Sequence, residues 1–380
     1  MEYINRIIAA KVMEAHQSFP VILITGPRQS GKTTLCRHLF PTYKFVNLEL
    51  ITMRNRANDD PEGFINWLGP CAIIDEAHNV PDILSVIQAK VDEDRSLRYI
   101  LTGSSNFALM RNVSQSLAGR VAVFTLLPLS LEELGKEYTN RPTDQLEYTG
   151  FYPGVVACGQ PADLFYESYL STYIERDVRD LLKVKNLNKF EHFVRLCAGR
   201  VSSELNASAL ATEVGVSSVT IAEWLSILQA SFIVFPLAPY YANIGKRLSK
   251  RPKLYFYDTG LMTHLLGITT YEQLETHPLR GAVFENLVTA EMMKTAYNAG
   301  QRPSLCFYRE NSGKEVDLVQ ETASGINLFE VKSSMTYRKD FIANMTYLQD
   351  NLSNVNNCTL IYDGDTIAPD IFNFRDYFCH

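Results

Sequence analysis

Short apolar runs alternate with helix-like stretches up to about residue 130 of the chain. The runs are "VILIT", "YKFVNL", "CAIID", "RYILTGSS" and "VAVFTLLPLS". Near-continuous apolar runs of this length are typical of strands buried on both faces, and strands that alternate with helices usually form a parallel sheet. The pattern therefore predicts an N-terminal α/β domain with a parallel sheet.

Helical periodicity replaces the strand pattern between about residues 160 and 235. In "YESYLSTYIERDVRDLL", apolar and aromatic side chains recur with i, i+3, i+4 spacing at Tyr166, Tyr169, Leu170, Tyr173 and Ile174. This spacing predicts an amphipathic helix with a stripe that faces the core. Its other face carries a run of charges, as solvated helix faces usually do: Glu175, Arg176, Asp177 and Arg179.

A helix, a turn at Gly215, a second helix capped by Ser217 or Ser218 and a strand are predicted next, which is the outline of a helix-turn-helix with a wing. The second helix contains no Lys or Arg, so it is poorly equipped to contact phosphates or to read guanine. The basic residues lie in the expected wing: Lys246, Arg247, Lys250, Arg251 and Lys253. Two alternatives stay open for this module, contact with a nucleic-acid backbone and packing between domains.

Composition and charge limit the class of protein. A chain of 380 residues is too long for one compact core, and 46% hydrophobic with 21% charged residues is typical of a soluble globular protein. The net charge of -6 argues against nucleic-acid binding over the whole surface but leaves a local basic patch open. The seven cysteines form no C-x-x-C pair, which argues against structural zinc and fits a reducing compartment.

No targeting or membrane segment is expected. The first residues lack the apolar core of a signal peptide, and no run approaches the roughly 20 apolar residues of a membrane span. We therefore expect a cytoplasmic protein that does not enter a membrane.

The strongest motif follows the first apolar run, where "GPRQSGKTT" matches the G-x-x-x-x-G-K-[ST] P-loop between a strand and a helix. In such a loop the backbone N–H groups and the helix N-terminus bind phosphates. Lys32 is expected to reach the β- and γ-phosphates of ATP, and the Thr33 hydroxyl to ligate Mg²⁺. The predicted nucleotide-binding residues are Gly26, Pro27, Arg28, Gln29, Ser30, Gly31, Lys32, Thr33 and Thr34.

Two carboxylates, Asp75 and Glu76, end the run "CAIIDE". A carboxylate at the end of a strand beside the P-loop strand can hold Mg²⁺ through water, and a second can orient or deprotonate the attacking water. We assign these roles to Asp75 and Glu76 respectively. The additional strand "YKFVNLEL" before them resembles the ATPases that carry an extra strand and a catalytic glutamate.

Further polar residues are candidates for completing this site. The strand "RYILTGSSN" ends with Ser104, Ser105 and Asn106, which suit contact with the γ-phosphate or with water but are equally typical of a plain turn. Arg120 is a candidate arginine finger for its own or a neighbour's nucleotide, and Arg176 is a second one. The alternative is that both are ordinary surface arginines.

Two charged pairs lie near the C-terminal end, Glu315 with Asp317 and Glu330 with Lys332, separated by the turn-like "TASG". Residues i and i+2 of a strand share a face, so the pairs can face each other across a hairpin. Alternating charge is also typical of an ordinary half-solvated hairpin. Glu285, which lies close to the apolar stripe of the preceding predicted helix, adds a carboxylate that is costly to bury without a partner.

The order of Glu285, Asp317, Glu330 and Lys332 matches that of the PD-(D/E)xK nuclease fold. In that chemistry the carboxylates, here Asp317 and Glu330, hold Mg²⁺ or Mn²⁺, and the lysine activates water or stabilises the pentavalent phosphate. The alternative is a nuclease-like fold without activity, in which the charges form a structural ion network.

Motifs along nearly the whole chain resemble a large prokaryotic family of AAA-type ATPases with an uncharacterised C-terminal domain that has a nuclease-like end. The motifs are "LITGPRQSGKTT", "IIDEAH", "ILTGSSN", "SLAGR", "YIERDV" and "KLYFYDTGL". The resemblance implies binding and hydrolysis of ATP without a settled substrate. "DEAH" is not a helicase label here, because the remaining helicase elements are not visible.

The expected architecture is α/β, with an N-terminal P-loop AAA-type parallel sheet, a helical and winged-helix middle and a C-terminal α/β nuclease-like domain. The expected regions are 1–135 (P-loop ATPase core), 136–200 (helical linker region), 201–265 (winged-helix-like module) and 266–380 (nuclease-like domain).

Three hypotheses of function follow from these motifs. The first is a Mg²⁺-dependent ATPase switch whose nucleotide state moves the helical and nuclease-like domains. The second is a nucleic-acid-processing nuclease gated by ATP, with a second Mg²⁺ or Mn²⁺, and the third is a nucleotide-binding scaffold without turnover. A protein partner, nucleic acid bound through residues 246–253, a homo-oligomer and the choice of ATP over GTP stay open.

Overall fold

The structure is a computed structural model that describes residues 3–104, 117–173, 187–240, 251–310 and 313–379. Several predicted site residues lie outside these ranges, and their roles stay predictions: Ser105, Asn106, Arg176, Lys246, Arg247 and Lys250. Within the described ranges, no helix is both long and apolar enough to cross a membrane.

The N-terminal part is built on a five-stranded parallel sheet with the strand order β2-β3-β4-β1-β5. Its strands are β1 (Val21–Gly26), β2 (Lys44–Asn47), β3 (Cys71–Asp75), β4 (Arg98–Ser104) and β5 (Val121–Thr125). Each strand coincides with one of the five apolar runs, and only β1 extends one residue beyond its run, to Gly26. The predicted parallel α/β sheet is therefore confirmed.

Helices cover both faces of this sheet because alternate strand residues point to opposite sides. Ile22 and Ile24 pack towards the helices α1 (Ala9–Ser18) and α2 (Lys32–Leu39). Strand residues that point to the opposite face, such as Leu23, form a second core. This core includes residues of α3 (Ile51–Asp59), α4 (Pro61–Leu68), η1 (Ala77–Asn79) and α5 (Ile83–Glu93).

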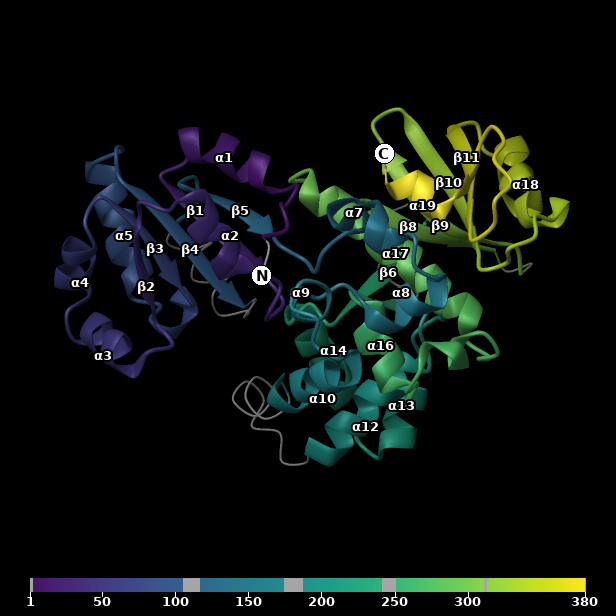
Figure 1. The fold of residues 1–380 in the computed structure, drawn as a ribbon, viewed down its shortest axis with the longest axis horizontal. Coiled ribbons are helices and arrows are strands. Elements are labelled where there is room, and N and C mark those ends of the chain that lie inside the picture. Colours follow the sequence, from purple (N-terminus) through teal and green to yellow (C-terminus); the bar gives the residue numbers. More distant parts are fainter. Residues whose placement is uncertain (1–2, 105–116, 174–186, 241–250, 311–312, 380) are drawn as a thin grey trace.

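A helical region follows the sheet, and most of it lies below the C-terminal part in the view of Figure 1. Its helices are α7 (Leu131–Thr139), α8 (Thr143–Thr149), α9 (Pro153–Val156), α10 (Ala162–Thr172), α12 (Leu187–Ala198), α13 (Ala207–Val214) and α14 (Ser218–Ala230). Gly215, in the left-handed conformation, ends α13, and Ser217 caps α14. The predicted helix, turn and second helix are therefore confirmed.

The C-terminal part is a mixed seven-stranded sheet with the order β12-β11-β10-β9-β8-β6-β7. Its strands are β6 (Val234–Pro239), β7 (Lys253–Phe256), β8 (Leu305–Arg309), β9 (Glu315–Thr322), β10 (Gly325–Lys332), β11 (Val355–Tyr362) and β12 (Ile371–Asn373). The antiparallel pair β6–β7, which the sequence suggests is a wing, extends this sheet because Ala238 on β6 pairs with Cys306 on β8.

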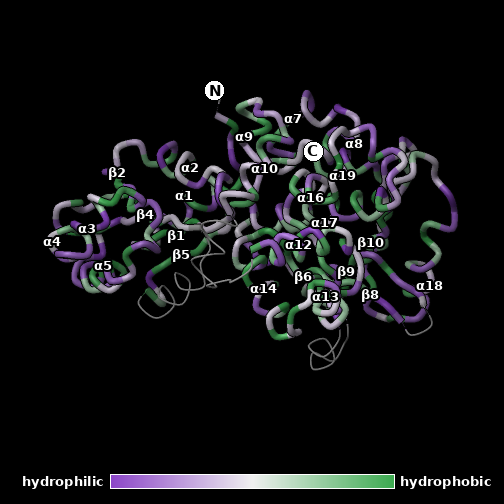
Figure 2. The backbone as a smooth tube through the Cα atoms, turned by 90° about the horizontal axis from the view of Figure 1, so that it is seen from below, coloured by the Kyte–Doolittle hydropathy of each residue, from purple (hydrophilic) through white to green (hydrophobic). Residues whose placement is uncertain are grey.

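Helices of the C-terminal part flank its sheet, and the longest of them is α17 (Arg280–Asn298). The others are α16 (Thr259–Leu265), η3 (Tyr271–Leu274), η4 (Lys339–Ile342), α18 (Ala343–Asn351) and α19 (Phe374–Phe378). Hydrophobic residues are concentrated on central elements such as β6 and β9, whereas peripheral helices such as α3 are largely hydrophilic (Figure 2).

A buried ion pair connects the C-terminal part to the chain that leaves the N-terminal sheet. Glu291 and Lys294 on α17 are 2.6 Å apart and almost fully buried. Glu291 accepts a hydrogen bond from the backbone N–H of Leu131, and Lys294 donates to the carbonyl of Leu129. Removing one member of a buried, fully hydrogen-bonded ion pair lowers the stability of the protein by several kcal/mol. The pair therefore fixes α17 against the start of α7.

The "DTGL" motif has a structural role. Asp258 caps α16 by accepting from the N–H of Leu261, and it also accepts from the Tyr166 hydroxyl and the N–H of Phe151. A Cβ atom on Gly260 would lie 2.4 Å from the Tyr166 hydroxyl oxygen, so this position requires glycine. The motif therefore holds α10 and the segment just before α9 against the C-terminal part.

Glu147 on α8 provides a test of pH-dependent stability. The residue is completely buried, and neither carboxylate oxygen has a hydrogen-bond partner among the described residues. Burial, with a contribution from Asp144, raises the pKa of Glu147 well above its ordinary value. The folded protein therefore binds this proton more tightly than the unfolded chain, and stability is lost as the pH rises above the pKa of the unfolded state.

We expect Glu147→Gln to raise the melting temperature at pH 8 and to raise it less at pH 5, because glutamine removes only the cost of the charge. The expected gain at pH 8 is at least about 1 kcal/mol in the free energy of unfolding, the scale of one pKa unit. Thermal unfolding at both pH values measures it, with the exposed Glu137→Gln as the matched control. Equal gains at the two pH values would contradict the burial argument.

Candidate nucleotide-binding site

The P-loop connects β1 to α2 and needs glycine at both ends. Gly26 has φ +143°, and a Cβ atom there would lie 2.1 Å from the carbonyl oxygen of Leu126. Gly31 has φ +96° and immediately precedes the first helical residue, Lys32. Both values are rarely adopted by other residues, so the glycines permit the sharp turn that directs backbone N–H groups towards a bound anion.

The site brings the P-loop lysine, Lys32, close to the carboxylates of Asp75 and Glu76. The Lys32 ammonium donates to the carbonyls of Gly26 and Pro27, at 3.0 and 2.7 Å. Burial lowers the pKa of Lys32, while the neighbouring Glu76 and Asp75 oppose this shift. Lys32 is thus a buried cation on the loop, where an anionic ligand would gain a charge-assisted contact.

Asp75 lies at the end of β3 and contacts the first turn of α2. The Thr33 hydroxyl donates to Asp75 Oδ1 at 2.8 Å, and the buried Thr102 hydroxyl donates to the same oxygen. Burial raises the pKa of Asp75, although the hydrogen bonds from Thr102 and Thr33 counteract it. A threonine hydroxyl beside a carboxylate is the oxygen pair that Mg²⁺ uses in P-loop ATPases, so these two residues fit that ion.

Glu76 follows Asp75 in a left-handed conformation, with φ +55°. This conformation is uncommon for a residue other than glycine and costs of order 1–3 kcal/mol, so the surrounding structure must hold it. The Thr102 hydroxyl accepts from the Glu76 backbone N–H at 3.2 Å, and His78 Nδ1 lies 3.1 Å from Glu76 Oε2. The strained backbone turns the carboxylate towards the P-loop pocket.

The pocket at the P-loop has a volume of about 510 Å³ and two walls from different parts of the chain. One wall consists of Glu76 and these P-loop residues: Arg28, Gln29, Gly31, Lys32, Thr33 and Thr34. The other wall comes from α9, α10 and the segment between them: Pro153, Gly154, Cys158, Gln160, Tyr169 and Thr172. A ligand on the P-loop would therefore also contact the helical region.

A smaller pocket of about 160 Å³ adjoins the first, because Gly31, Thr34 and Pro153 line both. The rest of its lining is mainly apolar and combines the N-terminal segment with the helical region: Tyr3, Ile4, Arg6, Ser30, Leu129 and Ala157. An apolar pocket beside a phosphate-binding loop suits a planar base.

Arg6 connects the P-loop to the chain that leaves the N-terminal sheet. Its buried guanidinium donates to the carbonyl of Ser30 at 2.9 Å and to the carbonyl of Leu127 at 2.7 Å, and it pairs with Glu133 at 3.0 Å. Glu133 in turn belongs to the capping box of α7 together with Ser130. The conformation of the P-loop is thus tied directly to the start of the helical region.

The structure does not place Arg120 near its own nucleotide site. Arg120 precedes β5 at the amino end of the parallel sheet, where Val121 pairs with Val21, whereas the P-loop begins at the carboxyl end after Gly26. Five residues of strand separate the two ends by about 16 Å. Arg120 instead forms two hydrogen bonds with Asp92 on α5, at 2.6 and 2.7 Å. The prediction of an arginine finger for the chain's own nucleotide is therefore wrong.

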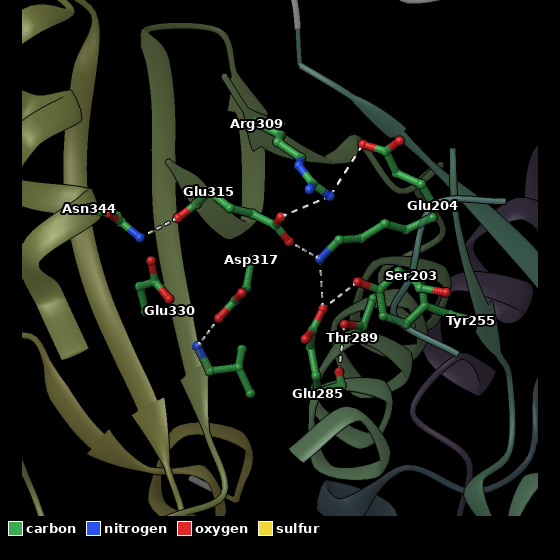
Figure 3. A network of polar contacts seen from close by, with 12 residues as sticks. Ser203, Glu204, Tyr255, Glu285, Thr289, Arg309, Glu315, Asp317, Glu330 and Asn344 are labelled. Atoms are coloured by element: carbon green, nitrogen blue, oxygen red, sulfur yellow. Dashed lines mark hydrogen bonds and ion pairs between the residues drawn. The ribbon is translucent and has the colours of Figure 1, made fainter. Parts of the chain in front are cut away.

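A second cluster of charges lies in the C-terminal sheet (Figure 3). Asp317 on β9 and Glu330 on β10 share the Lys332 ammonium, at 3.0 and 2.7 Å. Asp317 also accepts from the N–H of Val331. The "EVD" and "EVK" segments therefore lie on adjacent strands with their charges on one face.

Protonation differs between these two carboxyls. Burial and the neighbouring Asp317 raise the pKa of Glu330 to about 9. Burial acts in the same direction on Asp317, but the Lys332 charge and a hydrogen bond with Glu330 hold its pKa below the ordinary value. One carboxyl thus keeps a proton at neutral pH, as expected for two carboxyls held side by side.

Glu285 faces this pair from α17, and Lys253 on β7 lies beside it. Lys253 Nζ is 3.2 Å from Glu285 and 2.5 Å from Glu315, and the Tyr255 hydroxyl donates to Glu285 at 2.5 Å. Lys253 is almost fully buried, so it cannot belong to an exposed basic wing. The other described residue of that stretch, Arg251, is exposed.

These C-terminal residues do not fit a divalent ion in their present arrangement. No group of three or more His, Cys, Asp or Glu side chains in the described ranges could hold a metal ion. One oxygen of each carboxyl is already in contact with a lysine ammonium, that of Lys332 for Asp317 and Glu330 and that of Lys253 for Glu285. The predicted metal ligands Asp317 and Glu330 are thus neighbours, but they do not form a metal site as they stand.

Comparison with known proteins finds an AAA domain in the N-terminal part of the chain. Residues 18–135 match the model of a family described as "AAA domain". Residues 140–272 and 280–375 match two families described as domains of unknown function, DUF8612 and DUF4143. An uncharacterized protein of Mycobacterium tuberculosis is 31% identical over 341 residues, which cover 87% of this chain and 74% of that protein. The chain belongs to the same family as this protein.

Other similarities of this AAA-domain protein are more distant. An uncharacterized protein of Haemophilus influenzae is 21% identical over 274 residues, covering 67% of this chain and 64% of that protein. Among solved structures, a Walker-type ATPase of Pyrococcus abyssi is 15% identical with a TM-score of 0.45, covering 68% of this chain and 94% of the other. The AAA match confirms the prediction of a P-loop ATPase domain, whereas the C-terminal matches assign no activity.

Sequence reasoning missed several residues of the AAA-domain protein's sites. Thr102 could have been found, since it lies on β4 two residues before Ser104 and beside the strand of Asp75. Arg6, Gln160 and Thr172 carry no local motif and reach the P-loop only through tertiary structure.

Proposed function

We propose that this AAA-domain protein is a Mg²⁺-dependent ATPase switch in which the helical region senses the state of the bound nucleotide. The observation that carries this proposal is the pocket with two walls, because the P-loop and Glu76 face α9 and α10 across it. A ligand that contacts both walls favours the conformation in which they are close. Hydrolysis changes the ligand and thereby the relative position of the walls.

Each type of group at the P-loop has one role in this proposal. The phosphates bind the P-loop backbone and Lys32, and the base enters the apolar pocket beside Tyr3 and Ile4. Thr33 and Asp75 would hold Mg²⁺, which neutralises charge on the phosphates. Glu76 orients the attacking water and accepts its proton.

Two buried contacts transmit a movement of the P-loop to the C-terminal part. Arg6 ties the Ser30 carbonyl to Leu127 and to the capping box of α7. The Glu291–Lys294 pair ties the next residues of the same segment to α17, the helix that carries Glu285. Buried networks of this kind have few alternative arrangements, which suits a switch.

A negative charge on the helical wall tests whether the nucleotide touches it. We expect Thr172→Glu to weaken ATP binding by about tenfold or more, because a carboxylate beside the phosphates costs about 1–4 kcal/mol at 4 Å. Titration with a fluorescent ATP analogue measures the affinity. The matched control is Thr212→Glu on α13, since both hydroxyls are exposed and bond to the carbonyl four residues earlier.

The effect should be larger for ATP than for ADP if the wall faces the γ-phosphate. Equal affinities of the Thr172→Glu protein, the Thr212→Glu protein and the wild type would contradict a nucleotide that spans both walls. The ATPase assignment would then stand without the sensing role of the helical region.

A second candidate function is a nuclease in the C-terminal part, gated by ATP. The observation that favours it is the convergence of Asp317, Glu330 and Lys332 on one face of β9 and β10, with Glu285 opposite them on α17. This order and arrangement resemble those of the PD-(D/E)xK fold. Its substrate would be a nucleic acid, because the chemistry needs a phosphodiester.

A further inference from the structure

Lys253 is a second lysine beside the nuclease-like residues Glu285, Asp317, Glu330 and Lys332, but it does not belong to α17, β9 or β10. It lies on β7, and its ammonium contacts Glu285 on α17 and Glu315 on β9, 3.2 and 2.5 Å away. Its side chain is only 3% exposed. Lysine is almost never buried to this extent without charged partners, so the position of the ammonium is determined by these carboxylates.

The surrounding contacts hold each partner of Lys253 in place. The Tyr255 hydroxyl donates to the same Glu285 oxygen that contacts Lys253. Arg309 Nη1 lies 3.5 Å from the other oxygen of Glu315, and Asn344 donates to the Glu315 backbone carbonyl at 2.8 Å. Figure 3 shows Glu285 and Glu315 on opposite sides of this network, next to Asp317.

We propose that Lys253 is a built-in cation that occupies the ion position between Glu285 and Glu315 and keeps divalent metal ions out of the C-terminal site. This inference rests on the second candidate function. A divalent ion needs its oxygen ligands at about 2.0–2.6 Å, which leaves no room for an ammonium on the same oxygens. A metal ion enters only when Lys253 leaves these carboxylates.

The electrostatic interactions support the geometry. Burial lowers the pKa of Lys253, but Glu285, Glu315 and Asp317 outweigh it and raise the pKa overall, so the lysine stays charged. Burial and Asp317 raise the pKa of Glu285, whereas Lys253 lowers it. Without the lysine, the carboxylates would need either a proton or another cation.

Replacing the lysine with a neutral side chain of similar shape tests the inference. We expect full-length Lys253→Met protein, without nucleotide, to bind Mn²⁺ at least tenfold more tightly than the wild type in a calorimetric titration. Glu285→Gln in the same background should remove this gain, since it removes a ligand. The matched control is Lys339→Met, because Lys339 is an exposed lysine of the same part of the chain; it should titrate like the wild type.

Each other outcome overturns the inference in a distinguishable way. The wild type could already bind Mn²⁺ as tightly as Lys253→Met, with Asp317→Asn abolishing this binding. A metal site would then exist, and Lys253 would not keep the ion out of it. If a folded Lys253→Met protein binds no Mn²⁺, both the exclusion and the metal site of the second candidate function fail. Neither result bears on the ATPase switch.

A second variant covers the case in which Lys253→Met does not fold. Lys253→Gln also removes the ammonium and leaves both carboxylates, Glu285 and Glu315, in place. We expect a gain in Mn²⁺ affinity in the same direction as for Lys253→Met. Unchanged affinity of a folded Lys253→Gln protein would overturn the inference.

Discussion

The Lys32→Ala protein is expected to lose nucleotide binding, by at least about a hundredfold in affinity. Lys32 supplies a P-loop charge at the expected position of the phosphates, and hydrogen bonds to charged groups contribute about 1.5–3 kcal/mol each. Because Lys32 is buried, its charge acts in an environment that screens it weakly. Titration with a fluorescent ATP analogue measures the loss.

A structural effect of this substitution must be separated from the loss of charge. Lys32 also donates to the carbonyls of Gly26 and Pro27, so alanine removes two contacts within the loop. The melting temperature without nucleotide reports that effect. Lys11→Ala is the control, since Lys11 is an exposed lysine on the neighbouring helix α1. Affinity close to wild type in a folded Lys32→Ala protein would refute the assignment.

The N-terminal fold could be predicted from the sequence because its signals are local. Strands such as β1 are nearly continuous apolar runs, and the loop after β1 contains the glycines that its backbone requires. The C-terminal sheet is harder to predict from the sequence, because β6 joins it by pairing with β8, which is distant in the chain, and β7 joins it through β6. No periodicity within a segment reports such a pairing.

The two functional clusters differ in how many of their residues can be predicted from local sequence. The P-loop, Asp75 and Glu76 follow strands whose order determines that they meet. The second wall of the pocket comes from residues such as Gln160 and Thr172, which meet the P-loop only because the helical region folds back. Lys253 is a similar case, since its sequence context of basic residues indicated a surface role and the fold buries it.

The position of Arg120 far from the chain's own nucleotide site follows from the topology of the sheet. A residue just before a strand of a parallel sheet lies at the amino end, whereas ligands of such sheets bind at the carboxyl end. The pairing of Arg120 with Asp92 stabilises the surface there. An arginine finger from a neighbouring copy of the chain remains a separate question from the chain's own site.

The Glu76→Gln protein is expected to bind ATP like the wild type but to hydrolyse it at least about a hundredfold more slowly, the usual scale for a positioned general base. Glutamine keeps the size of the side chain and its ability to fit the left-handed backbone, but it cannot accept the proton of water. Phosphate release in a single turnover measures the rate, and ATP titration measures binding. Glu93→Gln, at the exposed end of α5, is the control.

Measuring ATP binding and ATP hydrolysis separately distinguishes three roles for this site. A scaffold without turnover would show no hydrolysis in the wild type, and a base elsewhere in the site would leave the rate of Glu76→Gln unchanged. If Glu76 is the base, the variant accumulates in the ATP-bound state. Partners that recognise this state should then be retained by the Glu76→Gln protein in a pull-down with ATP and released without it, because the two walls of the pocket stay bridged by the nucleotide.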